Sequence, residues 1–131
     1  SEQYPKGLGH TVAEISNTSA EGLTVEKDTF SCMANDGYAD HFNGLNKSQA
    51  IICGIEAHVC VLQTAIDLID RGLSVFVVAG ATSSRTAENH TLALERLKTA
   101  GAEIVSTEMV LFEWLRRAGT PEFKEISGLV K

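Results

Sequence analysis

Residues 50–80 read AIICGIEAHVCVLQTAIDLIDRGLSVFVVAG, and this stretch decides the fold. It opens with a continuous apolar run at residues 50–55, which is typical of a strand that is covered on both faces. From Val59 onward, apolar residues recur at helical spacing until Gly72 ends the helix. A second apolar strand follows at residues 73–80. The order of strand, helix and strand predicts two parallel strands joined by a helical crossover.

The same alternation continues beyond this stretch, where we expect a helix at 86–100, a strand at 102–107 and a helix at 107–119. The signals ahead of it are weaker, and there we expect a loop at 1–11, a helical turn at 12–16, a short extended segment at 23–26 and a weak helix at 36–44. These elements predict a three-layer αβα domain of the α/β class with a mostly parallel, doubly wound sheet. We interpret residues 1–131 as a single domain.

Charge and length limit the classes of function. The sequence has 17 acidic and 11 basic residues, and its formal net charge of -6 disfavours nucleic acid or an anionic membrane as the main partner. No apolar run is long enough to span a bilayer, and the first ten residues lack the pattern of a signal peptide. We therefore expect an intracellular protein, cytoplasmic or in an organelle such as the mitochondrion, that acts on a small molecule.

The three cysteines are too few and too irregularly spaced for a disulfide framework or a metal site. Cys53 lies inside the first apolar strand and is most simply a core residue, and Cys32 lies in a loop with no evident base beside it. Cys60 lies where a strand turns into a helix, at the carboxyl end of the sheet, where open α/β sheets bind ligands. Unpaired N–H groups at a helix start stabilise a thiolate or an oxyanion. By position, Cys60 is either a nucleophile or a small buried apolar residue.

Several segments together resemble one known family. GIEAHVCV at 54–61, with SSR at 83–85, is similar to the isochorismatase-like cysteine hydrolases, and specifically to the small isochorismatase domain-containing proteins. EQYPKGLG at 2–9, EKDTFSCM at 26–33 and PEFKEISGLVK at 121–131 resemble further parts of the same proteins. The resemblance implies an isochorismatase-like, Rossmann-like fold and a hydrolase that acts on a small-molecule amide or a related substrate.

The resemblance also assigns roles to particular residues. Members of the family use a Cys, Lys and Asp triad, in which the aspartate takes the thiol proton and the lysine stabilises the pair electrostatically. The nucleophile then corresponds to Cys60 and the lysine to Lys27. A cis peptide bond is implied just before Glu56, with an oxyanion site or pocket formed by Glu56, Ala57 and His58. Without the resemblance, Lys27 would be interpreted as a solvated lysine after a short strand.

The family's catalytic aspartate has no counterpart here, because it lies at the end of a first strand that precedes the EQYP segment. The chain therefore corresponds to the C-terminal part of the family domain, and Gly80 stands where the family usually has a further aspartate. The metal-binding residues of the related nicotinamidases also have no counterpart, so no metal and no other cofactor are expected. We expect this chain by itself to hydrolyse amides poorly.

Two alternatives to a hydrolase remain open. One is a catalytically inactive, truncated family member that acts as an interaction protein, and the other is a redox-responsive thiol protein that uses Cys60, alone or together with Cys32. A sheet without its central strand exposes unpaired edges and apolar faces, so a homo-oligomer is expected. Arg85, which follows two serines expected to cap the next helix, is expected to pair with a carboxylate.

Overall fold

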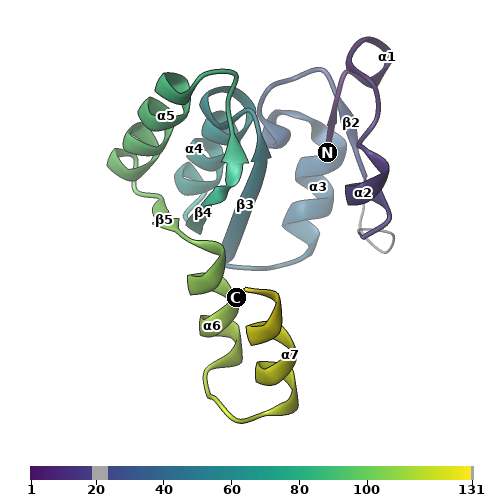
Figure 1. Ribbon diagram of the computed structural model, residues 1–131. Helices are drawn as coiled ribbons and strands as arrows, with labels where there is room; N and C mark the ends of the chain where they lie inside the picture. The colour runs from purple at the N-terminus through teal and green to yellow at the C-terminus, as the bar shows by residue number, and fades with distance from the viewer. Residues whose placement is uncertain (19–23, 131) are drawn as a thin grey trace.

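The computed structural model describes residues 1–18 and 24–130 (Figure 1). Its N-terminal part contains β1 (Glu2–Gln3), α1 (Pro5–Leu8), α2 (Ala13–Ser16), β2 (Glu26–Lys27), a 3₁₀ turn (Cys32–Ala34) and α3 (Asp36–Gly44). The following part contains β3 (Gln49–Ile55), a π-helical turn (Ala57–Val61), α4 (Leu62–Asp70), β4 (Ser74–Ser83), α5 (Ala87–Thr99), β5 (Glu103–Val105), α6 (Thr107–Leu115) and α7 (Pro121–Leu129). None of the described helices is long and apolar enough to cross a membrane.

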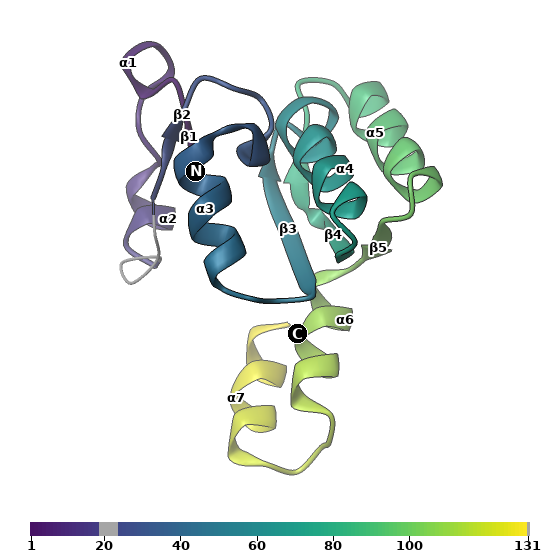
Figure 2. The ribbon, with the colours of Figure 1, turned by 180° about the vertical axis from the view of Figure 1, so that it is seen from behind.

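The larger sheet has three parallel strands in the order β3, β4, β5, with Ala50 opposite Val75 and Val77 opposite Ile104. A second, separate sheet pairs β1 with β2 in parallel and lies to the side of β3. Helices α4 and α5 cover one face of the larger sheet (Figure 2). The α/β class and the parallel crossovers predicted from the sequence are confirmed.

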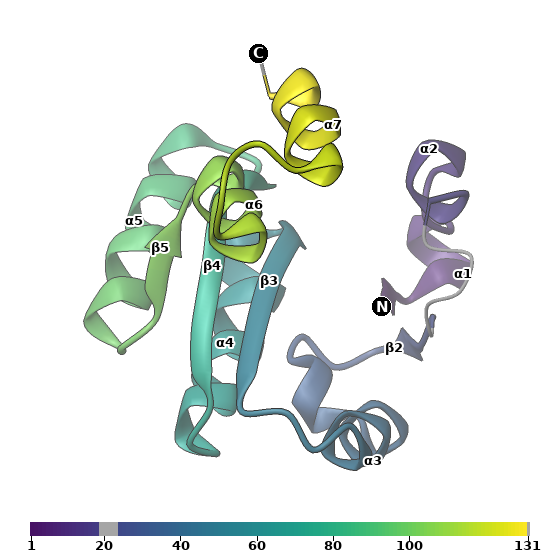
Figure 3. The same ribbon diagram turned by 90° about the horizontal axis from the view of Figure 1, so that it is seen from below.

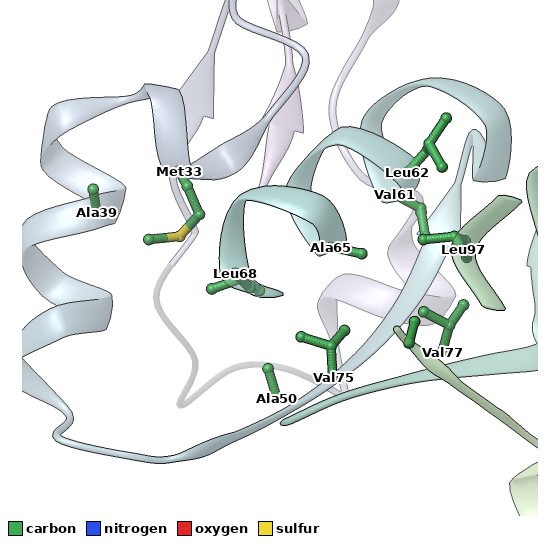
Figure 4. Close-up of a cluster of buried hydrophobic side chains, with 11 residues drawn as sticks. Met33, Ala39, Ala50, Val61, Leu62, Ala65, Leu68, Val75, Val77 and Leu97 are labelled. Carbon is green, nitrogen blue, oxygen red and sulfur yellow. The ribbon is translucent and has the colours of Figure 1, made fainter. Parts of the chain in front are cut away.

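The core lies between the larger sheet and its two covering helices (Figure 4). Alternate residues of β3 and β4 point toward the helices, because successive side chains of a strand face opposite ways. Leu97 of α5 meets Val75 and Val77 of β4 there, and these three side chains are almost completely buried. Met33 of the 3₁₀ turn also belongs to this cluster, so the segment after β2 packs directly against α4.

The opposite face of β3 is open, which contradicts the expectation that this strand is covered on both faces. Ile51 and Ile55 are 42% and 74% exposed, and Cys53 between them is exposed as well. Cys53 is therefore not a core residue, because its position in the alternation directs it away from α4. Among the described helices, α6 lies at one end of the larger sheet (Figure 3). Trp114 of α6 and Ile51 of β3 line a hollow there.

The ends of the chain also differ from the sequence-based expectations. The segment 1–11 contains β1 and α1 rather than only loop. The expected helix at 107–119 ends at Leu115, since Arg116 adopts a left-handed conformation, and α7 follows it unforeseen. Helix α5 is capped by Thr86 rather than by the preceding serines. Of the extended segment expected at 23–26, residue 23 lies outside the described residues.

Candidate active site

Cys60 lies in the π-helical turn that joins β3 to α4, at the carboxyl end of the larger sheet, as the sequence predicted. The N–H groups of Val59 and Val61 both donate to the Glu56 carbonyl oxygen at 3.2 Å. N–H groups ahead of the first helical bonds have no acceptor within a helix. The peptide bond between Ile55 and Glu56 is cis, as the resemblance implied.

Lys27 ends β2 and is buried, with 5% of its surface exposed. Its ammonium group donates to three oxygens, namely Gln3 Oε1 at 2.5 Å and the carbonyl oxygens of Thr29 and Phe30 at 2.9 Å each. These three acceptors match the three donors that a lysine ammonium offers. The interpretation of Lys27 as a solvated surface lysine is therefore wrong.

Gln3 joins Lys27 to Cys60. Its Oε1 atom, which accepts from the Lys27 ammonium, also lies 3.9 Å from Cys60 Sγ, at the distance of a weak S–H···O hydrogen bond. Its Nε2 atom donates to the Asp28 carbonyl oxygen at 2.9 Å, which fixes the orientation of the amide. The pairing of Gln3 with Lys27 in the two-stranded sheet brings these side chains together. Sequence analysis missed Gln3, whose only signal was its place in the EQYPKGLG segment.

The residues expected to form the oxyanion site or pocket lie in the same turn but have other side-chain partners. Glu56 accepts two hydrogen bonds from Arg85, at 3.0 and 2.7 Å, and this contact holds the pKa of Glu56 below its ordinary value. His58 Nδ1 lies 3.0 Å from Ser84 Oγ, and Ala57 is fully buried. Glu56 is therefore the carboxylate partner that was expected for Arg85.

No carboxylate or imidazole within residues 1–18 and 24–130 is hydrogen-bonded to Cys60. The described site thus contains a thiol, a buried cation and a bridging amide, but no group in contact with the thiol that has the basicity to remove its proton. The arrangement is suited to stabilising negative charge on sulfur and lacks a built-in proton acceptor.

One group of potential metal ligands occurs in the described part of the chain, formed by Glu2, His10 and Glu26. Glu2 already accepts from the backbone N–H of Thr11 at 2.7 Å and lies 2.8 Å from His10 Nδ1. These contacts lower the pKa of Glu2 to about 2, with the Thr11 hydrogen bond as the largest cause. Two of its three members, Glu2 and His10, are thus already paired with protein groups. The expectation of a metal-free site stays a prediction.

Comparison with known proteins adds the family. The model of the isochorismatase domain matches residues 7–109. A secreted isochorismatase effector of Phytophthora sojae is 43% identical over 134 residues, which cover 98% of this chain and 63% of that protein. Isochorismatase domain-containing protein 2 of Danio rerio is 43% identical over 130 residues, which cover 98% of this chain and 64% of that protein. The chain thus spans less than two thirds of the length of both relatives.

A solved structure agrees with these relatives. The MAR1 ribonuclease of Caenorhabditis elegans is 40% identical and superposes with a TM-score of 0.82, over 98% of this chain and 66% of that one. Because the effector of Phytophthora sojae is described as secreted, the intracellular location of this protein stays a prediction. The matches in sequence and in structure extend over nearly all of these residues, and the chain belongs to the isochorismatase domain family.

Proposed function

We propose that the site around Cys60 hydrolyses a small-molecule amide or a related substrate, with Cys60 as the nucleophile. The observation that carries this proposal is the position of Gln3 Oε1, which contacts both the buried Lys27 ammonium and the Cys60 thiol. A buried cation close to a thiol at a helix start favours the thiolate, which is the nucleophilic form. The family resemblance of both residues supports the same assignment.

The chemistry divides into acylation and release. The Cys60 sulfur attacks the carbonyl carbon, an S–C bond forms, and the C–N bond breaks as the amine leaves with a proton. Backbone N–H groups of the turn at Glu56, Ala57 and His58 are proposed to hold the oxyanion. Water then cleaves the thioester and releases the acid. Lys27 stabilises the negative charge on sulfur at the start of this sequence and again when the thiolate returns.

Proton transfer is the step that the described residues do not provide. Glu56 is held by Arg85 and His58 contacts Ser84, so neither is placed to protonate the leaving amine. In the family this role belongs to the aspartate of the first strand. Loss of general acid–base catalysis typically lowers a rate by about 10²–10⁴-fold. Because the amine leaves during acylation, this chain alone is expected to be acylated slowly by an amide and therefore to turn it over slowly.

The experiment compares this chain with a chimera that carries the opening βαβ segment of a family member. Both proteins receive a panel of small amides, and acyl-enzyme is followed by intact mass while product is followed separately. The proposal predicts acyl-enzyme and turnover with the chimera, slower acylation of this chain by the same amides, and neither acyl-enzyme nor product with the Cys60→Ser variants. Equal turnover by the two proteins would show that a residue within this chain supplies the proton. Acyl labelling that persists in Cys60→Ser would show that Cys60 is not the nucleophile.

A second candidate function is an interaction protein, and the open face of β3 favours it. Ile51 and Ile55 on this face are 42% and 74% exposed, and exposed apolar surfaces mark contact sites. We propose a homo-oligomer on the same grounds. The redox alternative at Cys60 has no described contact in its favour, since Cys32 is buried beside Ser1 with their side chains 3.2 Å apart.

The name of the Caenorhabditis elegans structure also raises RNA as a substrate. The charge of -6 works against binding a polyanion, because binding to a phosphate backbone draws its affinity from lysine and arginine. An RNA oligonucleotide in the substrate panel distinguishes RNA from a small-molecule amide as the substrate. We expect no cleavage of RNA under conditions in which Cys60 is acylated.

A further inference from the structure

Helix α4 begins at Leu62, two residues after Cys60, and also holds the segment that follows Lys27. The hydroxyl of Thr64 accepts from the backbone N–H of Cys32 at 3.0 Å, and this contact is buried. The carboxylate of Asp67 accepts from the Ser31 hydroxyl at 2.5 Å. The residues on α4 are three positions apart, so their side chains lie on one face of the helix. This face of α4 therefore holds the backbone of Cys32 and the side chain of Ser31.

A third bond of the same kind comes from the end of the helix. Arg71 Nη2 donates to the Met33 carbonyl oxygen at 3.2 Å. Arg71 lies four residues beyond Asp67, so it continues the same face of the helix toward its C-terminus. Along the helix, Thr64, Asp67 and Arg71 bind residues 32, 31 and 33 in turn, and together they hold this segment against α4 at three points.

The fastened segment in turn holds the ammonium group of Lys27. Two of its three acceptors are the carbonyl oxygens of Thr29 and Phe30. The hydroxyl of Thr29 donates to the Ser31 carbonyl oxygen at 2.8 Å, so the carbonyls are tied to the residue that Asp67 holds. A continuous chain of hydrogen bonds therefore runs from α4 to the cation beside Cys60.

This series of hydrogen bonds from α4 to Lys27 depends on the side chain of Ser31. It is 5% exposed, donates to the Asp67 carboxylate, and accepts from the Met33 backbone N–H at 3.1 Å. A hydrogen bond to a charged acceptor is stronger than one between neutral groups. Without the Ser31 hydroxyl, the Asp67 carboxylate and the Met33 N–H each lose a partner, and the segment loses its attachment at that point.

We propose that Ser31 and Asp67 are positioning residues that hold the Lys27 ammonium at its working distance from Cys60. The helix that presents the nucleophile is then also the element that fixes the cation, so the two move as one unit. This inference rests on the proposed function, in which Lys27 acts on Cys60. Neither residue touches the substrate or the reacting atoms in this proposal, and both act through the position of Lys27.

The test uses two measurements on the full chain. Pulse acetylation of Lys27, mapped by mass spectrometry, measures whether the ammonium is held in its buried place. The pH profile of Cys60 alkylation by iodoacetamide measures its effect on the thiol. We expect Ser31→Ala to raise the acetylation of Lys27 severalfold and to move the alkylation profile of Cys60 to higher pH. Asp67→Asn keeps an oxygen acceptor for the Ser31 hydroxyl and is expected to change both measurements less.

A matched control separates positioning from a general loss of stability. Ser106→Ala removes a serine hydroxyl that caps α6 by accepting from the Met109 N–H, as Ser31 caps its 3₁₀ turn, but it has no link to Lys27. It should leave both measurements unchanged. In a Lys27→Met background, Ser31→Ala should produce no further change in the alkylation profile. The same shift in that background, or an equal effect of Ser106→Ala, would overturn the proposal.

Failure of the positioning role of Ser31 can be distinguished from failure of the proposed role of Lys27 toward Cys60. Unchanged acetylation of Lys27 in Ser31→Ala overturns the positioning role, whatever Cys60 does. Raised acetylation, together with a Cys60 profile that does not respond to Lys27→Met, supports the positioning of Lys27 and overturns its role toward the thiol in the proposed function.

Discussion

Replacement of Lys27 by methionine tests the electrostatic part of the site. The contacts through Gln3, of 2.5 and 3.9 Å, place the Lys27 nitrogen and the Cys60 sulfur no more than about 6.4 Å apart. Two unit charges at that separation attract by roughly 2–3 kcal/mol at an effective dielectric constant of about 20, and less where water screens them. Because Cys60 is partly exposed, we expect a loss of about 1–2 kcal/mol, or roughly 5- to 30-fold in thiolate reactivity at neutral pH.

The assay is the rate of iodoacetamide alkylation at Cys60 in a Cys53→Ser background, because Cys53 is exposed and would also react. Lys98→Met, which removes an exposed lysine from α5, is the control for net charge and should leave the rate unchanged. Circular dichroism checks that each variant is folded. An alkylation rate in folded Lys27→Met equal to that of the parent would refute the electrostatic reasoning.

Three further predictions concern the fold. Leu97→Ala should lower the free energy of unfolding by about 2–5 kcal/mol in urea titrations, whereas Leu92→Ala, at a 55% exposed position of the same helix, should change it by less than about 0.5 kcal/mol. Arg85→Met should lower the urea midpoint at neutral pH. Since the pKa of Glu56 is depressed, that difference should disappear as the pH falls below 4.5 and through the lower folded value; a difference that persists in acid contradicts it. Sedimentation should show an oligomer that Ile51→Glu weakens, and a stable monomer of the parent chain would contradict this.

The strands and helices of the larger sheet could be predicted because their signals are local. The apolar runs at 50–55 and 73–80 have the composition of strands, and Gly72 ends the intervening helix with a positive φ of 85°. These local patterns were sufficient to place Cys60 at a strand-to-helix turn. Helix α7 has a local signal as well, since Thr120, Pro121 and Glu122 form a typical helix start. This helix is nevertheless absent from the elements predicted above.

The features that were missed depend on contacts between distant parts of the chain. The burial of Lys27 and the role of Gln3 follow from the pairing of β1 with β2, which are separated by more than twenty residues. Cys53 was assigned to the core because an apolar run does not show whether both faces of a strand are covered. The link between Asp67 and Ser31 and the identity of the carboxylate that binds Arg85 depend on how distant segments pack, so no spacing in the sequence indicates them.

Whether Cys60 is the nucleophile is decided by the site of acylation when this chain is treated with a small activated ester and digested for peptide mapping. We expect an acyl group on Cys60 that is abolished by Cys60→Ser and forms more slowly in Lys27→Met. An acyl group found mainly on the exposed Cys53, or equal labelling at Cys60 with and without the Lys27 ammonium, would contradict it.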